Sequence, residues 1–157
     1  MKKLELILII IPLLLIIIGL IINEFRTGII PFNILFPTGI YFLIIASIVG
    51  QKPWWDYLLG LFLVCIICVL AKELINYFMH SDCVGGGAIK LLVVIGAALG
   101  MMLGIQVTVV FIISGAVVSI MAYFIFSQNA VPSSPIILFS VLLVLGFNFG
   151  HKLLSKI

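Results

Sequence analysis

The chain has 157 residues, of which 65% are hydrophobic, and it carries only eight Lys and Arg and five Asp and Glu residues. A soluble domain usually has about a quarter of its residues charged, and a body of this size cannot hide so much apolar surface from water. A disordered chain is excluded too, because disorder requires low hydrophobicity and high charge. The net charge is +3 and Lys2-Lys3 is the one basic cluster, which argues against nucleic-acid binding. The composition therefore indicates an integral membrane protein. Its continuous apolar runs favour helices over the alternating strands of a β-barrel.

Six stretches of the sequence are candidate membrane spans, since a spanning helix needs about 20 mostly apolar residues. The first is too long for the core of a signal peptide and lacks a small-residue cleavage site, so we expect it to be retained. The fourth and fifth are almost contiguous, which leaves a five-span arrangement as an alternative. We predict a single all-α membrane domain over residues 1–157, with spans at about residues 4–23, 33–50, 56–78, 86–104, 106–127 and 134–149.

Six spans place both termini on the same side of the membrane. The basic residues on that side would be Lys2, Lys3, Lys52, Lys152 and Lys156, and those on the other side would be Arg26, Lys72 and Lys90. The positive-inside rule, taken alone, favours termini in the cytoplasm by this small margin.

A polar segment at residues 23–33 follows the first apolar stretch and contains Glu24, Arg26 and Pro31. Polar groups at a membrane are costly, so each needs an explanation. One interpretation is an ordinary interfacial loop in which Glu24 and Arg26 balance each other's charge and Pro31 starts the next helix.

Three consecutive glycines, Gly85, Gly86 and Gly87, precede the fourth stretch, and Lys90 follows shortly after them. The simpler interpretation is a flexible helix start. The functional interpretation is a non-helical segment that lines a wet cavity at membrane depth, with Lys90 facing that cavity. A phosphate-binding loop is not supported, because the pattern Gly-x-x-x-x-Gly-Lys does not occur.

The later part of the chain carries two further patterns. Gly96, Gly100 and Gly104 recur every four residues, a spacing that predicts close packing against a neighbouring helix. Pro132 and Pro135 predict an extended link that then opens the last helix.

In order and spacing, over nearly the whole chain, these motifs resemble those of the type IV prepilin peptidases and their archaeal preflagellin relatives. These are intramembrane aspartic proteases of the Gly-x-Gly-Asp type, and the short bacterial members are the most similar. The family's first motif has an Asp, an Arg two residues on, and an Ile-Pro pair whose Pro falls seven residues after the Asp. Glu24, Arg26 and Pro31 match these positions. The second motif, Gly-Gly-Gly-Asp-Ile-Lys-Leu-Leu, reads Gly-Gly-Gly-Ala-Ile-Lys-Leu-Leu at residues 85–92. A Pro-x-x-Pro before the last span is also similar to the family.

The resemblance implies that Glu24 and Ala88 occupy the positions of the family's two catalytic Asp residues. Arg26, Pro31, Gly85, Gly86, Gly87 and Lys90 would then shape the substrate site. Aspartic proteolysis needs one ionised carboxylate to take a proton from water and one protonated carboxyl to polarise the scissile carbonyl. A methyl group at position 88 can neither accept nor donate a proton. The Glu24 side chain is one methylene longer than Asp, which matters because catalytic groups need accurate placement.

No other acid matches the missing position. Asp82 precedes the glycines and would require the loop to fold back, and Glu73 lies more than a turn before that loop. We therefore expect the chain to be inactive, or nearly so, as a prepilin peptidase. The lone Ala88 change inside an intact motif favours an engineered origin, whereas Glu24 favours a natural degenerate copy; the sequence leaves both open.

The resemblance also implies a partner and a location. The family cuts pilin-like precursors after a short basic leader and before a hydrophobic helix, at the cytoplasmic face of the bacterial inner membrane. That orientation reverses the one favoured by the charge count, and we give the two motifs more weight. The competing hypothesis is a natural non-enzymatic pseudo-protease, or membrane assembly protein, that binds pilin-like helices. A small transporter or channel is less favoured, since the sequence shows no inverted repeat and few intramembrane charges.

We expect no cofactor and no metal. Cys65 and Cys68 have a metal-like spacing but lie in the middle of an apolar stretch without a companion pair, whereas zinc needs four ligands or three and a water. Larger family members carry an additional cytoplasmic Cys-x-x-Cys zinc segment, and some methylate the new N-terminus. Neither property is expected here.

Overall fold

The computed structural model of the chain describes residues 6–50, 52–79, 86–126 and 133–154. These residues form one turn of π-helix and six α-helices, with no strand among them. The elements are η1 (Leu6–Ile10), α2 (Ile11–Thr27), α3 (Phe32–Val49), α4 (Trp54–Met79), α5 (Gly86–Leu99), α6 (Met101–Phe126) and α7 (Ser133–Leu154). The prediction of an all-α polytopic membrane fold is confirmed.

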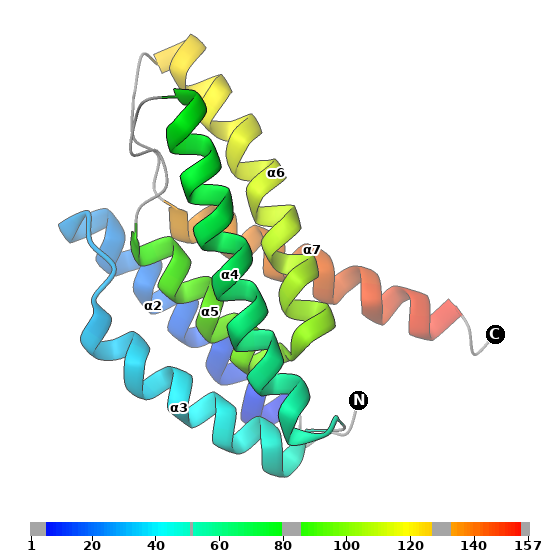
Figure 1. Cartoon of the computed structure of the whole chain (residues 1–157). Helices are drawn as coiled ribbons and strands as arrows, with labels where there is room; N and C mark the ends of the chain where they lie inside the picture. The colour runs from blue at the N-terminus through cyan, green and yellow to red at the C-terminus, as the bar shows by residue number, and fades with distance from the viewer. Residues whose placement is uncertain (1–5, 51, 80–85, 127–132, 155–157) are drawn as a thin grey trace.

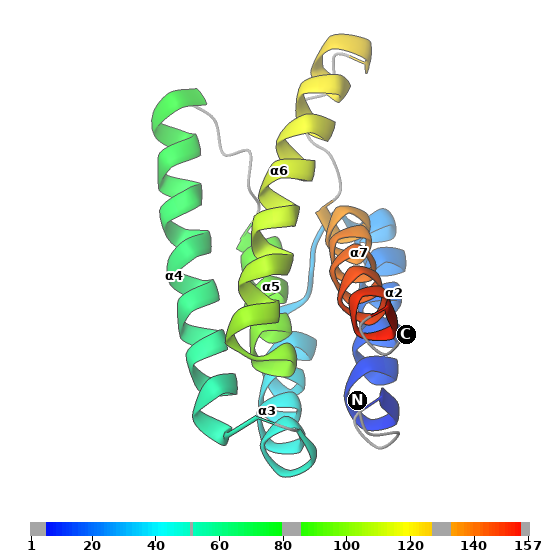
Figure 2. The same ribbon diagram turned by 90° about the vertical axis from the view of Figure 1, so that its right-hand side faces the viewer.

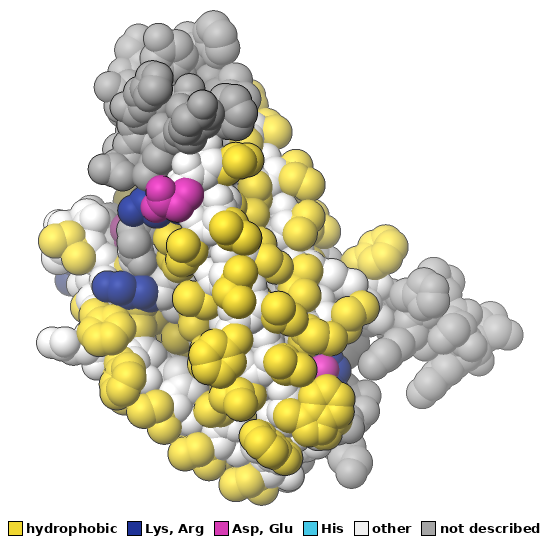
Figure 3. Space-filling model, viewed as in Figure 1, with side chains coloured by type: hydrophobic (Ala, Val, Ile, Leu, Met, Phe, Trp, Pro, Cys, Tyr) yellow, Lys and Arg dark blue, Asp and Glu magenta, His cyan; other side chains and the backbone are white. Residues whose placement is uncertain are grey.

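Four segments are long and apolar enough to cross a membrane: Ile7–Thr27, Phe32–Val49, Trp54–Leu74 and Met101–Val118. The apolar parts of α5 and α7, Gly87–Leu99 and Ser133–Asn148, are shorter. The view in Figure 3 shows a surface that is mostly hydrophobic, with a few charged side chains scattered over it. Such a surface suits contact with lipid. The division of the chain into six spans stays a prediction.

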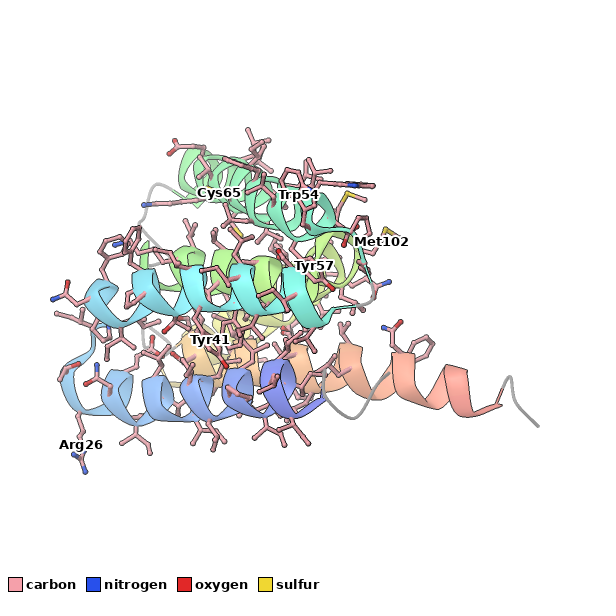
Figure 4. All side chains as sticks on the ribbon, turned by 90° about the horizontal axis from the view of Figure 1, so that it is seen from below. Arg26, Tyr41, Trp54, Tyr57, Cys65 and Met102 are labelled. Atoms are coloured by element: carbon pink, nitrogen blue, oxygen red, sulfur yellow. The ribbon has the colours of Figure 1, made fainter. Side chains whose placement is uncertain are left out.

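Helix α5 lies at the centre of the bundle, where it packs against α3, α4, α6 and α7 (Figures 1 and 2). Almost every residue from Leu91 to Gly100 is buried, and Leu91 and Ile95 are completely so. Helices α2 and α7 pack together on one side of the bundle. The phenol of Tyr41, between α2 and α3 in Figure 4, donates to the carbonyl of Leu8 at 3.3 Å. The helix that carries the second motif, α5, therefore forms the centre of the core, and α2, which carries Glu24, packs beside α7 at its side.

The boundary between the fourth and fifth predicted spans differs from the expected one. We expected helices over 86–104 and 106–127, but α5 ends at Leu99 and α6 begins at Met101. Gly100 lies between them with φ +80°, a left-handed conformation that glycine adopts without the steric cost of a side chain. Its N–H donates to the carbonyl of Gly96 at 2.9 Å. Hydropathy does not reveal this turn, because the residues on both sides of Gly100 are apolar.

Helices α4, α5 and α6 meet through glycines. A Cβ on Gly60 would lie 2.5 Å from the carbonyl oxygen of Gly96, and one on Gly104 would lie 2.9 Å from the Cα of Gly96. The predicted packing role of Gly96 and Gly104 is confirmed, whereas Gly100 forms the turn. Side chains at these positions would push the helices apart.

Replacing Gly96 with Ala should therefore destabilise the protein by about 1–3 kcal/mol, the usual cost of overpacking a tight core. Thermal unfolding in detergent measures the effect. Gly115→Ala on α6 is the matched control, because a Cβ there meets nothing within 4 Å. Equal melting temperatures for the two variants would contradict the close approach of α4 and α5.

Candidate active site

The first two motifs come together at one end of the bundle, where α2 and the N-termini of α3, α5 and α7 meet (Figure 1). Helix α2 ends at Thr27, and Gly28 terminates it with φ 69° and an N–H that donates to the Glu24 carbonyl at 2.8 Å. The Asn23 amide bridges this turn by donating to the Ile29 carbonyl at 3.0 Å. Pro31 then starts α3 in an extended conformation, as predicted for a helix-opening proline. The chain reverses here within a few residues, which fixes Glu24 on the last turn of α2.

The Glu24 carboxylate turns toward α7 and not toward Arg26. Its Oε1 accepts hydrogen bonds from the N–H and the hydroxyl of Ser133, both at 3.0 Å, and its Oε2 accepts one from the N–H of Ser134 at 2.8 Å. Arg26 is exposed and extends away from the helices in Figure 4. The interpretation of Glu24 and Arg26 as a local charge balance is therefore wrong for the carboxylate, whose partners lie on α7.

The glycines of the second motif begin a helix. Gly86 and Gly87 are the first residues of α5, so the hypothesis of a non-helical segment is wrong for these two; Gly85 lies outside the described residues. A Cβ on Gly87 would lie 2.8 Å from the Cβ of Ile30. Glycine at this position lets the segment after α2 approach the start of α5, which connects the first motif to the second.

Lys90, on α5, lies beside the start of α3. Its side chain is exposed, and its Nζ lies 4.8 Å from the centre of the Phe32 ring at the start of α3. An ammonium over an aromatic face is attracted by the negative charge density of the ring. The lysine thus helps to hold α5 against α3. The cavity predicted around Lys90 stays a prediction, because residues 80–85 beside it lie outside the described residues.

Ala88 is 1% exposed and belongs to the main hydrophobic core. Its methyl group has no proton to transfer and no lone pair to accept one. Glu24 lies near the end of α2, and Ala88 lies near the start of α5. The close approach of Ile30 to Gly87 connects these two regions. Of the two acids considered as replacements, Glu73 is exposed on α4 and Asp82 lies outside the described residues. The catalytic and site-shaping roles inferred for these positions stay predictions.

Sequence reasoning missed two polar clusters. One is the contact of Glu24 with Ser133 and Ser134. The serines carry a signal, because Ser is a preferred residue at helix starts, but nothing in the sequence names a partner 109 residues away. The other cluster contains Asp56 in the first turn of α4, which is 8% exposed and contacts the start of α6.

Asp56 holds the turn between α5 and α6. Its Oδ2 lies 3.1 Å from the Lys52 ammonium and accepts a hydrogen bond from the Met101 N–H at 3.2 Å. The same oxygen lies in the space that a Cβ on Gly100 would need. The carboxylate therefore caps α6 and requires glycine at position 100.

The fold and the position of the site define a polytopic helical membrane protein whose candidate residues gather at helix ends. The model of one family, described as the type IV leader peptidase family, matches residues 8–122, and the chain belongs to that family. No curated protein and no solved structure matches the chain. Helix α7, which provides the partners of Glu24, lies beyond the matched residues.

Proposed function

We propose that the chain is a prepilin-peptidase-like intramembrane protein whose catalytic pair is incomplete, so that the unmodified protein does not cleave a precursor. One observation carries the proposal: in a member of the leader peptidase family, the position that the motif resemblance assigns to the second catalytic Asp holds Ala88, a residue buried in an apolar core. Aspartic proteolysis requires a carboxyl group at this position, and alanine has none. The resemblance of the motifs supports the assignment of both positions.

The substrate class follows from the family. We propose that the partner is a pilin-like precursor with a leader peptide and a hydrophobic helix, which the protein would meet within the lipid bilayer. The apolar surface of the bundle suits a hydrophobic helix as a partner. The reversion of both catalytic positions to Asp, with cleavage of a pilin-type precursor as the measured quantity, tests this function.

A non-enzymatic role is the second candidate, and one contact favours it. The Glu24 carboxylate accepts three hydrogen bonds from α7 and Ala88 lies in the hydrophobic core, so both residues contribute to the packing of the fold. A pseudo-protease would bind the precursor without cutting it. Co-purification of the unmodified chain with a pilin-type precursor, together with failure of the reverted chain to cleave, would select this role.

The proposed location is the bacterial inner membrane, with the site at the cytoplasmic face and both termini outside. Single cysteines at Ser81 and Lys156, in a chain whose native cysteines are replaced, test the orientation. We expect a membrane-impermeant thiol reagent added to intact spheroplasts to label Lys156→Cys and to spare Ser81→Cys until the membrane is permeabilised. Labelling of Ser81→Cys alone from outside would reverse the orientation and support the positive-inside count.

A further inference from the structure

The Glu24 carboxylate is nearly saturated with hydrogen bonds from one helix start. A carboxylate can accept about four hydrogen bonds, and Glu24 accepts three, all from the first two residues of α7. A lytic water needs a carboxylate oxygen that is free to take its proton. Oε1, with two donors at 3.0 Å, has no such capacity left. Oε2 already accepts the Ser134 N–H at 2.8 Å, which leaves it one acceptor site.

These donors are groups that need an acceptor. The first N–H groups of a helix have no partner within the helix, and the helix dipole favours a negative charge beside them. The first two residues of α7 are Ser133 and Ser134, and Glu24 accepts hydrogen bonds from both of their N–H groups. The third residue, Pro135, has no N–H and needs no acceptor. Ser134 is completely buried, which makes water a poor substitute for the carboxylate.

No ion pair joins Glu24 to a cation among the described residues. A half-buried carboxylate without a cation needs compensation from oriented dipoles. The N-terminus of α7 provides it. The longer side chain of Glu, compared with Asp, extends the reach from α2 to the neighbouring helix.

We propose that Glu24 is an autoinhibitory clasp: it caps α7 from α2, and the cap occupies the carboxylate at the first catalytic position. The proposal rests on the proposed function only in taking position 24 as the family's first acid. The contact itself holds α7 against α2 whether or not position 24 takes part in catalysis. It also gives a physical reason for Glu at this position.

Paired variants isolate the clasp. Ser133→Pro removes the N–H and the hydroxyl that bind Oε1, and proline is well tolerated at the first position of a helix. Ser133→Ala removes the hydroxyl alone. Ser140→Ala is the matched control, because the Ser140 hydroxyl bonds to the Ile136 carbonyl within α7. Glu24→Gln removes the charge and keeps the size of the side chain.

Thermal unfolding in detergent gives the first readout. Glu24→Gln should lower the melting temperature by about 2–6 °C in the unmodified chain, and by much less when Ser133→Pro is already present. Ser133→Ala should give an intermediate coupling, and Ser140→Ala none. An unchanged effect of Glu24→Gln across all backgrounds would overturn the clasp, because independent sites give additive effects.

Accessibility of the carboxyl gives the second readout. A hydrophobic carbodiimide that reacts with carboxyl groups, followed by mass spectrometry of the peptide containing Glu24, should label Ser133→Pro several-fold more than the unmodified chain or Ser140→Ala. Equal labelling of all three would refute the occupied carboxylate. In an Ala88→Asp background, Ser133→Pro should also increase precursor cleavage several-fold. If no variant cleaves, the proposed function fails, while the melting and labelling results still decide the clasp.

Discussion

Replacing Ala88 and Glu24 together with Asp is expected to convert an inactive chain into one that removes the leader from a pilin-type precursor. The pair restores one ionised and one protonated carboxyl, the two groups that aspartic proteolysis requires. Positioned general acids and bases each contribute roughly 10²–10⁴-fold to a rate, so the double variant should exceed the unmodified chain by at least about 10²-fold. Glu24→Asp also shortens the side chain that reaches α7, which should release the clasp.

The matched control for this reversion is Ala88→Asn combined with Glu24→Asp. Asn has nearly the shape of Asp and places a similar polar burden on a position that is 1% exposed, but it cannot transfer a proton in the same way. Burying either side chain should cost about 1–3 kcal/mol, so the folded fraction of each variant is measured by size-exclusion chromatography before the assay. Cleavage by the Asn variant at the same rate would rule out the two-carboxyl explanation.

Replacing Asp56 with Ala should produce a large loss of stability, about 2–4 kcal/mol. The substitution leaves the Lys52 ammonium and the Met101 N–H without their acceptor, and removal of one partner from a buried polar network costs more than the network contributes in net terms. Thermal unfolding in detergent should show a lower melting temperature, by about 4–16 °C for a chain of this size.

Two variants separate the parts of this effect. Asp56→Asn keeps an oxygen that can accept from Met101 and should lose less than Asp56→Ala. Glu73→Gln changes an exposed acid on the same helix and should leave the melting temperature within about 1 °C, since surface charges contribute little. If Asp56→Ala and Glu73→Gln have the same melting temperature, Asp56 does not hold the turn between α5 and α6.

Composition and apolar runs predicted the helical membrane fold because burial of backbone groups in lipid leaves few alternatives. The order of the predicted spans placed Glu24 and the glycines on the same side of the membrane, and the structure brings the segment after α2 to the start of α5 through Ile30 and Gly87. The four-residue spacing of the glycines predicted the contact of Gly96 with a neighbouring helix, because residues at this spacing lie on one face of a helix.

What the sequence did not reveal depends on geometry between distant segments. The turn at Gly100 is set by a left-handed residue and by the Asp56 carboxylate on another helix, which hydropathy does not register. The partners of Glu24 are two serines on α7, and no local pattern couples them to α2. Lys90 was expected to face a cavity because a lysine within an apolar stretch suggests function, and its contact with the Phe32 ring on α3 was not predicted, since it joins two separate helices.

The most direct test is the mass of a pilin-type precursor after incubation with the unmodified chain in lipid vesicles, measured by intact mass spectrometry beside the chain carrying Asp at positions 24 and 88. We predict that the unmodified chain leaves the precursor at full mass, whereas the reverted chain yields the product without its leader. A leaderless product formed by the unmodified chain would contradict the central claim that Ala88 disables the catalytic pair.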